Sequence, residues 1–230
     1  MKYFVLTLSL LIMLFTFSCA HQSQTNGISI IATTTGLMKK SNAPFPIYLT
    51  NTPINRADLE KKHSPNIYIV HTGHILDSAL SKEDNEKNME KLISEGINLI
   101  NLTLEDFVIA EALGINFEVY NQTFLNSSVI DLSTDDLATA KNIKSYEIRE
   151  GLAFIGLSDS KLDKKLAENI SKEKYIINDY VLSILKVKKN VLKNLDSSPV
   201  QSFVIIHTLG NAIDEVMNRL PPSFINSLAD

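Results

Sequence analysis

The stretch NIYIVHTGHILDSA, residues 66–79, decides the fold of this chain. Apolar and aromatic positions run into His71, a short turn through Gly73 and His74 follows, and a polar helix start comes next. A strand, a tight turn and a helix in this order are typical of an open α/β sheet, which presents its chemistry at the carboxyl ends of strands. Two of the chain's five histidines lie on this turn, so it is the first candidate for a functional site.

Outward from this stretch, further apolar runs and helical spacings alternate along the chain. Strands are predicted at residues 27–34, 97–102, 124–130, 152–157 and 202–207. Helices are predicted at residues 56–62, 81–96, 105–113, 179–195 and 211–220. Residues 35–53 hold three prolines and are expected to be irregular surface. Because near-continuous apolar strands alternate with helices, the sequence predicts one α/β domain with a largely parallel sheet covered on both faces.

The first 18 residues have the pattern of a secretory signal peptide: Lys2, an apolar-rich run over residues 3–17, and the small residue Ser18. The run is shorter than the roughly 20 residues that a spanning helix needs. The single cysteine, Cys19, follows directly, and residues 16–19 are similar to the lipobox of bacterial lipoproteins, with Thr16 where Leu is usual. We therefore expect a signal peptide at 1–18, a tether at 19–26 beginning with lipidated Cys19, and a domain at 27–230. The alternative is an ordinary signal peptide with a coincidental cysteine.

This N-terminus predicts export across the inner membrane and attachment to a membrane of the cell envelope, on the periplasmic side or at the outer membrane. The net charge of −4 gives no support to a nucleic-acid partner. With one cysteine, the chain forms no intrachain disulfide, so its stability must come from packing. A lysine cluster at 186, 188, 189 and 193 is interpreted as the solvated face of a helix.

Five strand ends follow the order of motifs in the metal-dependent phosphoesterase domain of secreted bacterial 5′-nucleotidases, which are calcineurin-like metallophosphoesterases. Residues 31–36 stand at the family's Asn-Asp-x-His-Gly, residues 71–79 at Asp-x-Gly-Asp-x-x-x-Gly-Ser, and residues 102–107 at Leu-Gly-Asn-His-Glu-Phe. Residues 155–158 match Ile-Gly-Leu-Thr, and residues 205–210 match Val-Leu-Ser-His-Leu-Gly. The chain resembles this family over residues 28–230. The resemblance implies an α/β fold with mostly parallel and mixed sheets in a metallophosphoesterase-type α/β/β/α sandwich, truncated before the family's last Gly-Gly-His-x-His.

The resemblance also implies two metal ions that activate a water and hold a phosphate, but most of the ligand positions carry other side chains here. His74 stands where the family has the carboxylate that bridges both metals, and a neutral imidazole offers one lone pair where a carboxylate offers two oxygens. Glu105 stands where a His assists phosphate transfer. The other departures are Thr33, Thr35, Leu104 and Thr208. The resemblance therefore implies a degenerate site.

The most specific hypothesis for an enzyme is a site that differs from the family's two-metal site and holds one divalent ion, Zn, Mn or Fe. Five residues of metal-binding type follow strand ends on one edge of the sheet, namely His71, His74, Glu105, Asp106 and His207. The alternative is that these are exposed or half-buried polar residues left after a site decayed, with no cofactor.

The preferred function is an envelope lipoprotein whose nucleotidase-like domain binds a protein partner or a phosphate-containing small ligand without hydrolysis. The alternative is a divergent metal-dependent phosphohydrolase. A third possibility is one part of a split enzyme whose missing ligands come from another chain.

Overall fold

The structure is a computed structural model that describes residues 29–30, 36–38, 45–62, 65–162, 174–193, 200 and 202–221. The predicted signal peptide, Cys19, the tether, Thr33 and Thr35 lie outside the described residues. Predictions about them stay predictions. Within the described part, no helix is both long enough and apolar enough to cross a membrane.

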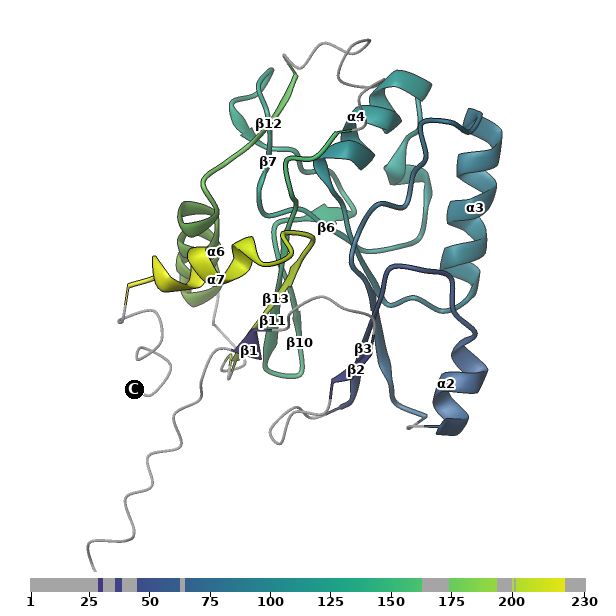
Figure 1. Cartoon of the computed structure of the whole chain (residues 1–230), viewed down its shortest axis with the longest axis horizontal. Coiled ribbons are helices and arrows are strands. Elements are labelled where there is room, and N and C mark those ends of the chain that lie inside the picture. Colours follow the sequence, from purple (N-terminus) through teal and green to yellow (C-terminus); the bar gives the residue numbers. More distant parts are fainter. Residues whose placement is uncertain are drawn as a thin grey trace, which may run out of the picture.

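The larger of the two main sheets has six strands and contains the stretch that decides the fold (Figure 1). Its order is β2 (Gly36–Met38), β3 (Ile47–Thr50), β4 (Tyr68–His71), β5 (Leu99–Asn101), β6 (Phe124–Leu125) and β9 (Ile143–Lys144). All neighbours are parallel except β2 and β3, which are antiparallel.

The second main sheet has four strands, in the order β1 (Ser29–Ile30), β13 (Ser202–His207), β11 (Leu152–Leu157) and β10 (Glu147–Arg149). Here β10 is antiparallel to β11, and the other two pairings are parallel. A small antiparallel sheet of β12 (Tyr175–Ile177), β7 (Val129–Asp131) and β8 (Asp136–Leu137) lies apart from both.

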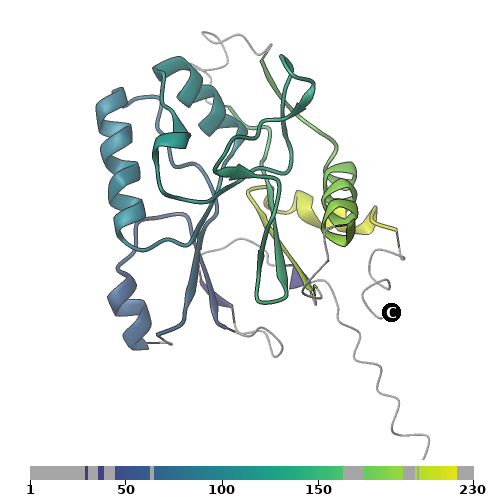
Figure 2. The ribbon, with the colours of Figure 1, turned by 180° about the vertical axis from the view of Figure 1, so that it is seen from behind.

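The helices form two outer layers. The layer on the six-stranded sheet holds α3 (Lys82–Ser94) and α4 (Leu104–Leu113), with α2 (Arg56–Lys62) and the short 3₁₀ helix η1 (Phe117–Val119) nearby. The layer on the four-stranded sheet holds α6 (Tyr180–Lys193) and α7 (Ala212–Asn218). Figure 1 and the reverse view in Figure 2 both place α6 and α7 on the opposite side of the molecule from α3.

Strand alternation explains why the apolar runs are almost continuous. Along β4, Ile69 packs under α3 and α4 while Val70 packs between the two main sheets. Along β11, Ile155 packs under α6 and α7 while Phe154 faces the other sheet. Each strand therefore needs apolar residues on both faces. The result is the predicted α/β/β/α sandwich with mostly parallel and mixed sheets.

Two local predictions were wrong. Residues 35–53 are not wholly irregular, because β2 and β3 lie there and Leu49 of β3 is buried between the sheets. Residues 124–130 do not form one strand, because β6 and β7 belong to different sheets. Between them Asn126 is buried, and its side chain donates to Val129 O and accepts from Val129 N–H. That local bonding competes with a continuous ladder.

Candidate functional site

The carboxyl ends of β4, β5 and β11 are tied together by one buried side chain. Asn101 at the end of β5 donates from Nδ2 to Thr72 O after β4, at 3.0 Å, and to Leu157 O of β11, at 3.1 Å. The two main sheets can approach this closely because residue 156 is glycine, where a Cβ would collide with Asn101 Oδ1. This contact brings the predicted site residues to one edge of the molecule.

The turn after β4 has an unusual backbone. Gly73 has φ +125°, and a Cβ there would lie 2.5 Å from Thr103 Cγ2. His74 has φ +57°, in the left-handed region that side chains other than glycine seldom adopt. Such a conformation persists only where the surroundings hold it, and it occurs often at functional sites.

The buried carboxylate of Asp106 holds this turn. It accepts the backbone N–H groups of His74, Ile75 and Leu76 at 3.1, 2.8 and 3.0 Å. It also accepts the N–H and the hydroxyl of Thr103 at 2.9 and 2.8 Å, which completes a capping box at the start of α4. We call this arrangement the Asp106 clamp.

The clamp uses the acceptor capacity of Asp106, which is completely buried. Burial raises the pKa of its carboxyl group, and the hydrogen bonds from Thr103 and Leu76 with the charge of His74 offset part of that rise. Asp106, predicted as a metal ligand, thus has its oxygens engaged with the backbone of the neighbouring turn.

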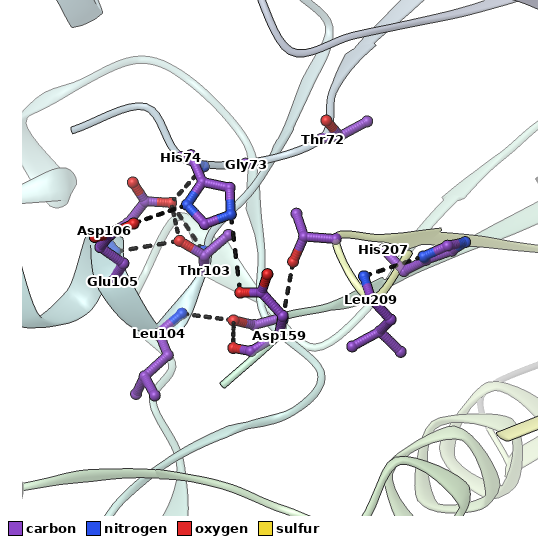
Figure 3. A network of polar contacts seen from close by, with 12 residues as sticks. Thr72, Gly73, His74, Thr103, Leu104, Glu105, Asp106, Asp159, His207 and Leu209 are labelled. Atoms are coloured by element: carbon purple, nitrogen blue, oxygen red, sulfur yellow. Dashed lines mark hydrogen bonds and ion pairs between the residues drawn. The ribbon is translucent and has the colours of Figure 1, made fainter. Parts of the chain in front are cut away.

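The side chain of His74 lies between two carboxylates (Figure 3). Its Nδ1 is 3.0 Å from Glu105 Oε2, and its Nε2 is 3.8 Å from Asp159 Oδ1. The longer distance is that of an ion pair rather than a hydrogen bond. We call these three residues the His74 triad.

The carboxylates hold His74 protonated. Asp159 raises the pKa of His74 most, the charge of Asp106 and the contact with Glu105 add to the rise, and burial opposes it; the pKa reaches about 9. At neutral pH the imidazole is therefore a cation with both nitrogens protonated, and a metal ion could bind it only after a proton is lost.

Asp159 was missed by the sequence predictions. It follows Ser158 at the end of β11, and its N–H donates to Thr208 Oγ1 at 2.8 Å. Its Oδ1 is buried and has no hydrogen bond within the described residues, so its interaction there is the ion pair with His74. The available signal was an acidic residue two positions after the end of a buried strand.

His71 and His207 have a different role from His74. Both are almost fully buried at the ends of parallel strands, and in each the Nδ1 accepts a backbone N–H two residues ahead, from Gly73 or Leu209, at 3.3 Å. Burial, followed by the charge of His74, lowers the pKa of His71 to about 4, so it is neutral at pH 7. With Nδ1 accepting, a neutral ring carries its proton on Nε2.

The five predicted metal ligands are thus divided among three arrangements. His74 and Glu105 belong to the His74 triad, Asp106 to the clamp, and His71 and His207 to strand ends. Over the part of the chain that the structure describes, no group of three or more His, Cys, Asp or Glu side chains is arranged to hold a metal ion.

The two-metal centre that the sequence resemblance implies does not fit the described positions. Leu104, the first residue of α4, is buried in the core, and its N–H donates to Ser158 Oγ at 2.6 Å. Thr208 Oγ1 accepts from Asp159 N–H, and His74 is a cation. At these described positions, a hydroxyl already bonded to the backbone, an apolar side chain and a cation are poor ligands for a divalent ion.

No protein-family model matches this chain, and no curated protein sequence matches it. Solved structures do match its fold. A 5′-nucleotidase precursor of Thermus thermophilus aligns with a TM-score of 0.51 at 16% identity, covering 73% of this chain and 33% of its own. The sulfate thiohydrolase SoxB of the same species aligns with a TM-score of 0.51 at 12% identity, covering 72% and 31%. This chain thus matches about a third of each of those proteins, and its fold is the metallophosphoesterase-type α/β fold that they share.

Proposed function

We propose that this protein is a cell-envelope lipoprotein whose metallophosphoesterase-type domain binds a protein partner and does not hydrolyse phosphate esters. The observation that carries the proposal is the His74 triad. At the position where the sequence resemblance puts a metal-bridging carboxylate, the chain has an imidazolium paired with Glu105 and Asp159.

The protonation of His74 and the charge of its surroundings oppose the inherited chemistry in different ways. With both ring nitrogens protonated, His74 has no lone pair to hold the divalent metal ions that the family's mechanism requires. Two carboxylates surround this cation, and the carboxylate of Asp106 is bonded to the same turn. An incoming phosphate would therefore meet net negative charge. Of the two partner classes expected from the sequence, a protein partner fits these charges better than a phosphate-containing ligand.

The attachment to the envelope rests on the N-terminal sequence alone. Lys2, the apolar run over residues 3–17, and Ser18 before Cys19 support export followed by lipidation. Replacement of the thiol in Cys19→Ser should abolish fatty-acid labelling of the protein in a bacterial host. Persistent labelling would contradict the lipoprotein assignment without affecting the conclusion on hydrolysis.

Metal content and turnover test the lack of hydrolysis. The mature chain, purified without chelators, should contain less than stoichiometric Zn, Mn and Fe, and should release no phosphate from nucleotides or an aryl phosphate with any added divalent ion. A 5′-nucleotidase assayed in parallel confirms that the conditions support the reaction. Stoichiometric metal together with turnover that is lost in His74→Ala would overturn the proposal in favour of a divergent metal-dependent phosphohydrolase.

A further inference from the structure

The outer face of α6 carries an exposed stripe of leucines and lysines. The inner face packs on the four-stranded sheet through Val181, Ile184, Val187 and Val191. The opposite face presents side chains spaced three and four residues apart, which places them in one row. This Lys–Leu stripe consists of Leu182, Lys186, Lys189, Leu192 and Lys193, and the half-buried Leu185 lies at its border with the core.

Two leucines of α6 are unusually open to solvent for their type. Leu182 is 59% exposed and Leu192 is 42% exposed. Leu185 and Leu192 together with neighbouring lysines line a hollow of about 390 Å³ on the same face. Apolar side chains grouped on one helix face and bordered by cations are typical of a helix that lies in a membrane interface.

The charge of the stripe contrasts with that of the whole chain. The chain has a net charge of −4, whereas α6 contains four lysines and no acidic residue. Lys186 pairs with Asp136 at 3.0 Å, but both side chains are more than half exposed, so this pair is weak. Lys189 and Lys193 make no ion pair among the described residues. The stripe is therefore a local cationic surface on an acidic protein.

The start of the domain lies in the same half of the sandwich. β1 pairs with β13 in the sheet that α6 and α7 cover, as Figure 1 and Figure 2 show. Ser29 of β1 is ten residues after Cys19. Because an extended chain advances at most ~3.5 Å per residue, a lipid on Cys19 would hold β1 within about 35 Å of the membrane.

We propose that the Lys–Leu stripe of α6 lies on the anionic lipid surface of the membrane, as a second attachment beside the lipid anchor. The inference takes the anchor at Cys19 from the proposed function and adds the surface of the domain that faces the lipid. The leucines enter the interface while the lysines attract anionic headgroups, and one acyl chain or one cationic patch alone gives only reversible binding.

Vesicle binding tests the stripe without the anchor. The mature chain, residues 19–230, carrying Cys19→Ser so that no lipid is attached, should sediment with vesicles that contain phosphatidylglycerol. It should not sediment with phosphatidylcholine alone, and added salt should weaken the binding. Since each lysine near an anionic surface contributes roughly fivefold, Lys186→Glu/Lys189→Glu/Lys193→Glu should weaken binding by about a hundredfold or more.

A matched triple variant on the opposite helix layer provides the control. Lys62→Glu/Lys87→Glu/Lys91→Glu changes the net charge equally at exposed positions of α2 and α3, and should leave binding within about threefold of the parent. Leu182→Ala/Leu192→Ala should weaken binding about tenfold with its circular dichroism spectrum unchanged, because it removes apolar insertion.

Three results would overturn the inference. They are no binding by the parent, equal losses in both triple variants, and self-association in solution that the α6 variants abolish, which would identify the stripe as a contact between copies of this chain. None of these results depends on metal content or phosphate release, or on fatty-acid labelling at Cys19. Failure here is therefore distinguishable from failure of the proposed function.

Discussion

His71 ends β4 and His74 lies three residues later on the following turn, yet their surroundings give them opposite protonation states. His71 is enclosed by the strand ends, and its pKa falls to about 4 because burial penalises the imidazolium. His74 is held out of the core by a left-handed backbone and lies beside two carboxylates, which raise its pKa to about 9. At neutral pH one ring is therefore a neutral acceptor at a strand end, and the other is a cation at the surface.

The comparison extends to His207, at the carboxyl end of β13 in the four-stranded sheet. His207, the last residue of β13, repeats the geometry of His71, with a backbone N–H donating to Nδ1 from two residues ahead. These two histidines belong to the buried frame of the edge, together with the Asp106 clamp and Asn101. Of the His74 triad, this frame exposes mainly the His74 ring, whereas Glu105 is partly exposed and Asp159 is buried. The sequence motif at residues 71–79 therefore combines a structural residue, His71, with a residue of the triad, His74. Substitutions should affect the two differently.

The largest effect on the free energy of unfolding is expected from a substitution in the Asp106 clamp. Asp106→Ala leaves five donors without their buried acceptor, and we expect a loss of about 3–5 kcal/mol in the free energy of unfolding. The neighbouring substitution Glu105→Ala removes a partly exposed ion pair and should cost less than about 1 kcal/mol. Urea unfolding measures both. Similar losses of unfolding free energy in Asp106→Ala and Glu105→Ala would refute the distinction between the buried frame and the His74 triad.

The next largest effect is the pH dependence due to His71. Its pKa is about 4 in the folded protein and near 6.5 in the unfolded chain, so the unfolded state binds more protons between these values. Stability should therefore fall by up to about 3 kcal/mol as pH is lowered from about 6.5 to 4. His71→Leu should flatten this part of the curve relative to the parent. An unchanged slope in the variant would show that His71 is not buried as a neutral ring.

The close contact between the sheets should respond to an added methyl group. In Gly156→Ala the new Cβ would collide with Asn101 Oδ1 and lie 2.9 Å from Leu125 Cβ, so we expect a loss of about 1–3 kcal/mol. The double variant Gly156→Ala/Asn101→Ala should cost less than the sum of the single variants, because the second substitution makes room. Additive losses in denaturant unfolding would contradict the direct contact.

The smallest effect on stability is expected from His74. Its pKa is raised, so its contribution is fully present below about 6.5 and is lost as pH rises through about 9. The partial exposure of the ring screens this contribution, which should stay below about 1 kcal/mol. NMR titration of the ring protons gives a sharper measurement. Asp159→Asn should lower the pKa of His74 more than Glu105→Gln does, and the reverse order would exclude the ion pair with Asp159 as the main cause.

Local sequence signals were sufficient for most elements of the frame. The predicted helices at 56–62, 81–96, 105–113, 179–195 and 211–220 all occur within a few residues of their predicted ends. Their ends have local causes, such as Ser81 Oγ accepting the N–H of Asp84, and Gly114 in the left-handed region at the end of α4. The strands at 152–157 and 202–207 were also predicted correctly, because long apolar runs have few alternatives.

Contacts between distant residues decided the rest. Short strands such as β2, β8 and β12 have no periodicity of their own and form because a partner strand lies beside them. The sequence placed His74, Glu105 and Asp106 after strand ends but could not distinguish the partly exposed carboxylate of Glu105 from the fully buried one of Asp106. Nor did it indicate that Asp159, 85 residues after His74, would become its partner.

By itself, therefore, the sequence determined the layers of this protein, since apolar periodicity and helix caps act over a few neighbouring residues. It also determined that histidines and carboxylates lie at the carboxyl ends of the strands. Only the tertiary structure decided their protonation, because the pKa of a histidine depends on burial and on charges brought together by folding. The same turn thus holds one neutral histidine and one cation, where the order of motifs alone had suggested a pair of metal ligands.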